Sequence, residues 1–544
     1  RGLGDVYKRQ VKGEKWYDPR TSNGEDENGE VVKRIREYKK MVWSNTLSYL
    51  TTFNNIHHLD FLAGYEIDDT YNDYLSGEAY NFTTPDKHAI SNGMKTVSVG
   101  GSDSRYRLVS YLSRLNYDYK NKYYLGASFR VDGSSRLHRD NRWGTFWSVS
   151  GAWRTIEEEF MQPVKDWLTD LRIRASYGVN GTLPSDYFGY MGLSSISGGY
   201  LEQPGIQMSQ IANPNLKWET NYNMNIGLDF GFWDRLNFTI EYYTRTTKNL
   251  LMDCPVSMTT GFSSYLMNIG EVKNKGIELT INSTNIKIKD FNWNTTFNLG
   301  HNSNKVVKLD GEQTQIVSGT QIHKVGSSYR TFYVQEFAGI NPETGNPLFY
   351  TNELDENGNY IKEITENSKN AQFIPYKHAE PTVNGGISNS LRYKWLDLNF
   401  LFSYQFGGYS YDTWAQKTEH GGYDSYANIP TYYRDSWKKP GDQTNIEVYM
   451  PGKSSSVSMH KITSSRRIHS TDYFRLKNIT FGITLPKEWT NKINIGNVRF
   501  YASASNLWTW AAYDNYDPEA VSAGSATQTT PPLKTVTFGL NINF

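Results

Sequence analysis

Aromatic residues gather in residues 407–471, and they are the side chains of this sequence best suited to bind a ligand. A flat ring stacks on the apolar face of a sugar, while charged neighbours such as Asp412, Asp424 and Arg434 could bind its hydroxyl groups. The alternative is that the rings pack the segment itself or a protein interface, where Tyr and Trp are also enriched. The candidate substrate-binding residues are Tyr409, Tyr411, Trp414, Tyr432, Tyr433 and Trp437, with Tyr423 and Tyr426 nearby.

Three arginines form a second candidate group. Arg130, Arg172 and Arg174 fall on the polar faces of predicted strands, where they could meet a substrate. A charge on such a face is more often solvated or paired with an acidic residue.

The residue pattern gives little support for catalysis or metal binding. The motifs GxSxG, HExxH, the P-loop and GxGxxG are absent. His57 and His58 would face opposite sides of a strand, and Asp355 opens an acidic stretch that lacks EF-hand spacing and indicates a turn. Cys254 is the one cysteine and precedes Pro255 in an expected loop, so no disulfide can form within the chain. We expect no enzyme activity, no cofactor and no metal site.

The elements that position these residues are strands of regular alternation. Period-two alternation of apolar and polar residues predicts a strand with one apolar and one wet face. In one predicted strand the apolar residues move from even to odd positions between Leu476 and Ile479, which predicts a bulge near Asn478. The alternation is clearest in residues 123–132, 171–180, 221–230, 291–299 and 396–406.

The connections alternate between short and long, as they do in outer-membrane β-barrels, whose long loops lie outside the cell. We count about fifteen strands. Because closed bacterial barrels of one chain have an even number of strands, this count predicts that the chain begins partway through a barrel. Short turns follow Phe53, Tyr119, Phe230, Ile286 and Leu391, and long segments fill residues 70–101, 181–217, 303–380, 407–471 and 511–531.

Composition and the final strand agree with a membrane barrel. Only 38% of the 544 residues are hydrophobic, with a mean hydropathy of -0.64, yet 15% are aromatic. The net charge of +1 gives no excess of positive charge that would favour nucleic-acid binding. No signal peptide is visible, and no apolar run is long enough for a membrane helix. From Pro532 the chain alternates up to Phe544, and a terminal aromatic residue is typical of outer-membrane barrels. The predicted fold class is all-β, an antiparallel transmembrane β-barrel.

Residues 1–10 do not match the pattern of the remaining sequence, and we interpret them as a truncation or an artefact of sequencing or cloning. They are excluded from the fold prediction. Residues 11–544 are predicted to form a partial outer-membrane β-barrel with long extracellular loops.

Ordered motifs extend across about residues 38–544. They are FRVDGSSR (129–136), RWGTFWSVSGAWR (142–154), LRIRASYGVNG (171–181), NPNLKWET (213–220), NIGLDFGF (225–232), YYTRTTKNLL (242–251), NIGEVKNKGIELT (268–280), DYFRLKNITFGITLP (472–486), SASNLWTW (503–510) and YDPE (516–519). In the motif at residues 268–280, Asn274-Lys275-Gly276 predicts a bulge or bend, with Gly276 at positive φ. Together the motifs resemble the SusC/RagA family of TonB-dependent outer-membrane transporters. Trp147 and Thr182 depart from the family pattern.

The resemblance implies TonB-dependent import of oligosaccharides or peptides across the cell outer membrane of a Gram-negative bacterium. It implies a barrel of about 22 strands, of which this chain carries the C-terminal part without the plug domain. It also implies outer-membrane lipid around the barrel, a SusD-like surface lipoprotein as partner, and TonB–ExbB–ExbD coupling through the missing N-terminal part. Two alternatives remain open: an outer-membrane barrel enzyme, and a soluble β-rich glycan-binding or adhesin module.

Overall fold

The computed structural model describes residues 2–200, 203–309, 314–423, 428–452, 462–490, 492, 495–527 and 529–543 of the chain. Its residues group into two compact units. Unit 1 comprises Arg1–Trp153, Ala175–Asn223 and Thr247–Ile269, and unit 2 comprises Arg154–Arg174, Met224–Thr246 and Gly270–Phe544. Among the described residues, no helix combines the length and the apolar character that crossing a bilayer requires.

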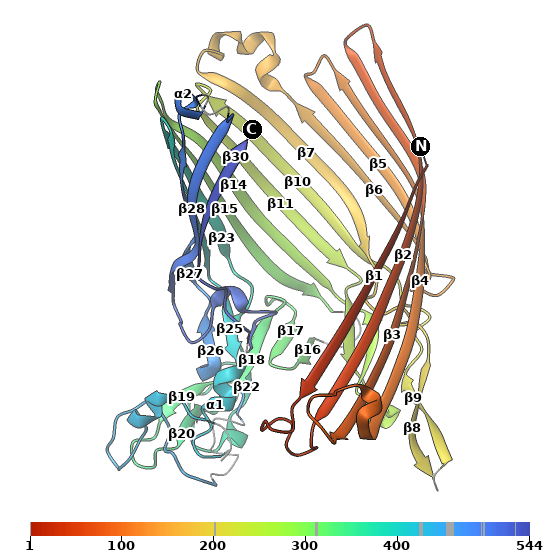
Figure 1. Ribbon diagram of the computed structural model, residues 1–544, viewed down its shortest axis with the longest axis vertical. Coiled ribbons are helices and arrows are strands. Elements are labelled where there is room, and N and C mark those ends of the chain that lie inside the picture. The colour runs from red at the N-terminus through yellow and green to blue at the C-terminus, as the bar shows by residue number, and fades with distance from the viewer. Residues whose placement is uncertain are drawn as a thin grey trace. The chain divides into compact units, whose positions relative to one another are not determined.

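Sixteen strands of the described chain follow one another in a single antiparallel hydrogen-bonded order that matches their order in the sequence (Figure 1). The confirmed fold class is therefore all-β. The strands are β1 (Gly2–Tyr17), β2 (Glu30–Phe53), β3 (His57–Phe82), β4 (Gly93–Tyr119), β5 (Tyr123–Ser134), β6 (Trp143–Trp153), β7 (Leu168–Thr182), β10 (Glu219–Phe232), β11 (Leu236–Lys248), β14 (Glu271–Lys287), β15 (Phe291–Lys308), β23 (Val383–Tyr393), β24 (Leu396–Phe406), β27 (Tyr473–Thr484), β28 (Asn497–Ala511) and β30 (Thr535–Asn543).

Several of the apolar rows predicted from alternation carry strongly exposed side chains, as expected of a row that faces lipid. Leu125 and Phe129 of β5 are 57% and 50% exposed, and Phe538 of β30 is 81% exposed. Phe544 lies outside the described residues. The short turns occur where they were predicted: Asn54 and Asn55, for example, take φ of 52° and 57° between β2 and β3. Left-handed pairs of this kind suit the right-handed twist of a tight hairpin.

The strand count was one short, and the missing strand is β1. Its partner is β2, with Gly2 opposite Asn45 and Tyr17 opposite Glu30, so residues 2–10 lie in a regular ladder. Because sixteen is even, the strand count no longer serves to predict that the chain begins partway through a barrel. The interpretation of residues 1–10 as an artefact stays a prediction.

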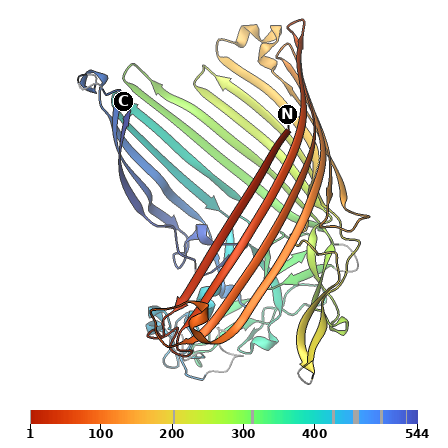
Figure 2. The same cartoon turned by 45° about the vertical axis from the view of Figure 1, so that its right-hand side comes forward.

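Residues 70–101 were predicted to be a long loop, and that prediction was wrong. β2, β3 and β4 span 24, 26 and 27 residues, and only residues 83–92 connect β3 to β4 (Figure 2). Apolar residues become sparse beyond Asp68 and Asp69, so the alternation that predicts a strand is lost there, but the backbone ladder continues and ion pairs support it. Arg105 bonds Asp69 at 2.7 Å and Lys40 bonds Asp68 at 2.6 Å.

The two predicted irregularities had different outcomes. The bulge near Asn478 is confirmed, because the register of β27 shifts between Leu476 and Asn478 against both neighbouring strands. The bulge at Gly276 is wrong: Gly276 lies opposite Asn302 in regular register and its φ is not positive. A side chain is excluded there because a Cβ would lie 2.2 Å from the His301 carbonyl oxygen and 2.6 Å from the Tyr243 ring.

The longer connections of unit 2 fold onto one another. We call the described residues of 309–382, 407–472 and 512–534 the loop body. Figure 1 shows much of it gathered beyond one end of β23 and β27. Its strands are β16 (Gln315–Ser318), β17 (Gln321–Lys324), β18 (Thr331–Gln335), β19 (Phe337–Ile340), β20 (Pro347–Tyr350), β21 (Ile364–Thr365), β22 (Phe373–His378), β25 (Tyr409–Asp412), β26 (Ile468–Ser470) and β29 (Ser525–Ala526).

Unit 1 carries two small hairpins in its connections, β8 (Leu193–Tyr200) with β9 (Gln203–Gln210), and β12 (Leu251–Pro255) with β13 (Ser264–Asn268). Leu137, Phe146, Leu216 and Trp218 form a buried cluster, against which Leu251 of β12 and Leu266 of β13 pack. Cys254 lies buried in β12 rather than in a loop.

Candidate functional site

The aromatic stretch belongs to the loop body and is organised by β25, a short helix α1 (Thr413–Thr418), and β26. β25 pairs antiparallel with β26 and parallel with β29, which joins residues 407–471 to residues 512–534. Asp412 ends β25 and caps α1, because its carboxylate accepts a hydrogen bond of 2.8 Å from the Ala415 backbone N–H. These contacts fix the direction in which α1 presents its side chains.

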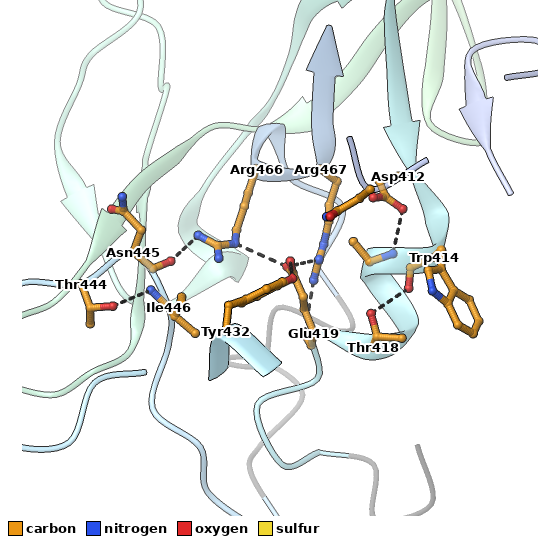
Figure 3. Close-up of polar contacts among 12 residues, drawn as sticks. Asp412, Trp414, Thr418, Glu419, Tyr432, Thr444, Asn445, Ile446, Arg466 and Arg467 are labelled. Atoms are coloured by element: carbon orange, nitrogen blue, oxygen red, sulfur yellow. Dashed lines mark hydrogen bonds and ion pairs between the residues drawn. The ribbon is translucent and has the colours of Figure 1, made fainter. Parts of the chain in front are cut away.

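A buried ionic network lies at the end of α1 (Figure 3). The Glu419 carboxylate accepts hydrogen bonds from the Arg467 guanidinium and the Tyr432 hydroxyl, and Arg466 lies 3.6 Å away. Arg467 has no exposed surface. Burial, and then the neighbouring Glu419 carboxylate, raise the pKa of Tyr432. The network therefore holds two arginines and a neutral phenol around one carboxylate, so these four side chains carry one positive charge more than negative.

Two of the predicted binding rings are buried. Tyr411 is 1% exposed and packs in a cluster with Phe332, Val334 and Ile468, and Tyr433 is 5% exposed. A buried ring cannot offer its face to a ligand, so in this structure Tyr411 and Tyr433 serve the packing of the loop body. Sequence could not indicate this, because two of the residues that cover Tyr411, Phe332 and Val334, come from another connection.

The other four predicted rings retain exposed surface. Trp414 is 43% exposed, and Figure 3 shows its indole directed away from the Glu419 network. Tyr409, Tyr432 and Trp437 are half-buried. The Trp437 indole N–H donates a 2.7 Å hydrogen bond to the Pro342 carbonyl, which fixes its ring. Trp414 is therefore the ring most open to a ligand, and Asp424 and Tyr426 lie outside the described residues.

A second polar layer joins β26 to the connection after β28. The His469 ring stacks on Tyr513 with centroids 3.7 Å apart and planes 3° apart, and the Tyr513 hydroxyl donates to Asp412 at 3.1 Å. Burial lowers the pKa of His469, so the ring is held neutral.

The residue pattern did not predict a buried arginine that anchors the loop body to β27. Arg475 is 2% exposed, bonds Asp517 at 2.6 Å and Thr509 at 3.0 Å, and also donates to Glu519. Lys477, at the bulge, binds the same Glu519 carboxylate at 2.7 Å. The signal was present in the YDPE motif, but no sequence rule connects that motif to an arginine on a distant strand.

The three arginines predicted on polar faces are paired with acidic side chains in the structure. In unit 1, Arg130 bonds Asp132 at 2.7 Å. In unit 2, Arg172 and Arg174 share Asp229, at 2.9 and 3.0 Å.

The adjacent histidines have separate partners. His57 bonds the Tyr117 hydroxyl at 2.8 Å and His58 the Thr52 hydroxyl at 3.2 Å. Across the part of the chain that the structure describes, no group of three His, Cys, Asp or Glu residues is arranged to hold a metal ion.

Comparison with known proteins gives consistent results. Residues 3–353 match the family described as TonB dependent receptor-like, beta-barrel. TonB-dependent receptor P3 of Formosa agariphila is 32% identical over 95% of this chain and 53% of its own length. TonB-dependent receptor SusC of Bacteroides thetaiotaomicron is 29% identical over 95% of this chain and 51% of its own length.

Among solved structures, a chain of the RagAB peptide transporter superposes with a TM-score of 0.88 at 26% identity, covering 100% of this chain and 60% of that one. A structure of the RagAB peptide importer in an open state gives a TM-score of 0.87. The chain thus spans about half the length of the curated relatives it matches.

Proposed function

This chain belongs to the TonB-dependent receptor family, with relatives of the SusC and RagA kind, and we propose that its protein imports a nutrient across the outer membrane. The observation that carries the proposal is the agreement of the whole chain with a chain of the RagAB transporter, at a TM-score of 0.88. The localisation is the cell outer membrane, where this barrel family resides.

The proposed substrate is an oligosaccharide or a peptide. The partly exposed rings of the loop body, Trp414 above all, support a sugar, since a ring stacks on the apolar face of a pyranose. The peptide alternative is supported by the RagAB relative, which is described as a peptide transporter.

The proposed partners are a SusD-like surface lipoprotein, which would hand the substrate to the barrel, and the TonB–ExbB–ExbD complex. Both are inferred from the relatives rather than from a contact within this chain. Energy coupling is assigned to the part of the relatives' length that this chain does not span.

The test is deletion of the complete gene in the source bacterium, followed by growth on single oligosaccharides and peptides. We expect growth on at least one of them to be lost and restored by the gene. Restoration with Trp414→Ala should raise the half-saturating substrate concentration about two- to tenfold, because one stacked aromatic contact is worth about 0.5–1.5 kcal/mol. Trp489→Ala is the control, an indole 59% exposed in α2 (Lys487–Thr490) at the opposite end of β27. Unchanged growth of the deletion strain on every substrate would contradict import.

The two alternative functions, a barrel enzyme and a soluble glycan-binding or adhesin module, predict different experimental results. A barrel enzyme would retain turnover of a substrate when the TonB system is deleted, whereas import would stop. A soluble glycan-binding module would stay dissolved without detergent, whereas exposed apolar rows such as Leu125 and Phe129 require lipid or detergent. The relatives are named as receptors and transporters, which favours import over both.

A further inference from the structure

A polar pocket of about 350 Å³ lies in unit 2, apart from the network of Figure 3. It is formed where the three connections of the loop body meet the end of β24. Its polar wall consists of Arg330, Glu380, Gln405, Thr471 and Glu519. The volume is within the usual range for pockets that bind small ligands, at its lower end.

The pocket lies on the wet side of the sheet. Gln405 occupies the polar face of β24, opposite to Tyr404 and Phe406, and its amide bonds the Thr471 hydroxyl at 3.3 Å. Glu519 reaches the pocket from the connection after β28 while Arg475 and Lys477 of β27 hold its carboxylate. A solute that passes along this face of the sheet would meet the pocket.

One wall of the pocket is held in an unfavourable backbone conformation. Ala523 takes φ of 51°, in the left-handed region, which costs a residue with a Cβ about 1–2 kcal/mol. The conformation is fixed from two strands: the Gln321 side-chain amide of β17 donates to the Ala523 carbonyl at 2.7 Å, and the backbone N–H of Tyr411 in β25 donates to the Gly524 carbonyl at 2.8 Å. Strain that is held in place by its surroundings is found mainly at ligand sites and switches.

The charges of the pocket are already matched. Arg330 pairs with Glu380 at 3.1 Å, with their side chains 38% and 31% exposed. Arg475 and Lys477 together balance the charges of Glu519 and Asp517. A charged ligand group would have to displace one of these pairs. A hydroxyl group can instead donate to a carboxylate and accept from a guanidinium or an amide while the pairs stay intact.

We propose that this pocket is a subsite for one uncharged, hydroxyl-rich unit of the substrate, a sugar residue, bound through Arg330, Glu380, Gln405 and Glu519. The inference rests on the proposed import function and narrows its substrate class to neutral oligosaccharides. The ring stacking at Trp414 and the hydroxyl recognition in this pocket would then act on different units of one chain.

The experiment measures binding to the complete protein, purified in detergent, by calorimetry. The probes are neutral hexasaccharides of glucose, mannose and xylose in α and β linkage, hexagalacturonate, and one acidic and one basic hexapeptide. We expect a neutral hexasaccharide to bind, and Glu380→Gln and Gln405→Leu each to weaken its binding at least tenfold. Lys362→Gln is the matched control, since it removes the exposed loop-body pair of Lys362 with Glu336 outside the pocket.

A labelling measurement reports occupancy directly. In Val521→Cys the new thiol lines the pocket, and the native Cys254 is buried. The bound neutral hexasaccharide should slow reaction of this thiol with a water-soluble maleimide, and the charged probes should not.

Two results would overturn the subsite. One is that only charged probes bind, and the other is that the neutral probe binds both pocket variants as it binds the parent. Either result leaves import itself intact if the gene deletion abolishes growth on the substrate that binds, so a failed subsite is distinguished from a failed function.

Discussion

Gly276 occupies a position in β14 where the fold leaves no room for a side chain. It was expected to bend the chain, yet it stands in a straight ladder where the neighbouring strand brings the Tyr243 ring against its Cα. The Tyr243 hydroxyl in turn donates to Asn302 at 3.0 Å, which holds the ring there. The glycine is required for close approach and not for backbone freedom.

We therefore expect Gly276→Ala to destabilise the protein by about 1–3 kcal/mol, the usual cost of overpacking. The measurement is the temperature at which the folded band converts to the unfolded band in semi-native electrophoresis. Gly151→Ala is the control, because a Cβ there meets only the Tyr124 carbonyl oxygen at 3.8 Å. Equal midpoints for the two variants would show that the Tyr243 contact does not constrain position 276.

The burial of individual rings is the part of the candidate site that sequence could not supply. Tyr411 and Trp414 are close in the chain and alike in type, but one is 1% and the other 43% exposed. The difference arises from Phe332 and Val334, which belong to another connection. The sequence shows where the aromatic residues are concentrated, whereas the exposure of each ring depends on contacts between loops.

At the scale of elements, alternation predicted the strands wherever one face is apolar. It failed at Asp68 and Asp69, where β3 leaves the apolar stretch but stays in the ladder. A membrane crossing needs about 9–11 strand residues, so strands of 24 to 27 residues extend the sheet well beyond the bilayer. A stretch with few apolar residues shows no apolar period in its sequence. Only its backbone pairing with neighbouring strands in the structure reveals that it is a strand.

The extended ladder predicts a specific cross-link. Asn72 lies directly opposite Ser104 in β3 and β4, so Asn72→Cys with Ser104→Cys should form a disulfide in the outer membrane under mild oxidation. Asn72→Cys with Asp103→Cys should not, since neighbouring residues of a strand face opposite sides. Mass spectrometry of peptides from the oxidised protein distinguishes the two pairs. Equal cross-linking of both would indicate a mobile loop in place of the ladder.

The neutral His469 makes the loop body sensitive to acid. Burial lowers its pKa from the ordinary histidine value of 6.5, with Arg467 and Arg466 acting in the same direction and Asp412 and Glu419 opposing. Because the unfolded state binds the proton more readily, this stability is complete above pH 6.5 and is lost as pH falls through the folded pKa. The loss is at most about 1.4 kcal/mol for each pH unit.

Protease resistance of the loop body should therefore fall between pH 7 and pH 5, as followed by cleavage of intact outer membranes. His469→Phe keeps a flat ring against Tyr513 and should flatten this dependence. His323, whose pKa burial also lowers, should retain part of it, and His323→Phe serves as the comparison. An unchanged pH profile in His469→Phe would show that the ring is not the group that titrates.

At the scale of the whole molecule, the apolar rows decide between a membrane barrel and a soluble module. Val149 and Ser150 are neighbours on β6 that face opposite sides, and Val149 is 47% exposed. Val149→Arg should cost about 2–4 kcal/mol if the residue faces the middle of the bilayer. Ser150→Arg, on the wet face, should cost little. The measurement is the denaturant midpoint of each variant in lipid vesicles, and equal midpoints would argue against a lipid-facing row.

The contacts between the connections of the loop body limit how the substrate preference of such a protein could change. Tyr411 packs on Phe332 and Gln321 holds Ala523, so the three connections of the loop body contact one another, while Arg475 of β27 holds Asp517 and Glu519. Replacing a single loop from a relative would leave buried charges without partners and rings without cover. Under the proposed function, a new substrate preference would then arise through small changes at the pocket and at exposed rings, or by exchange of the three connections together as one inherited block.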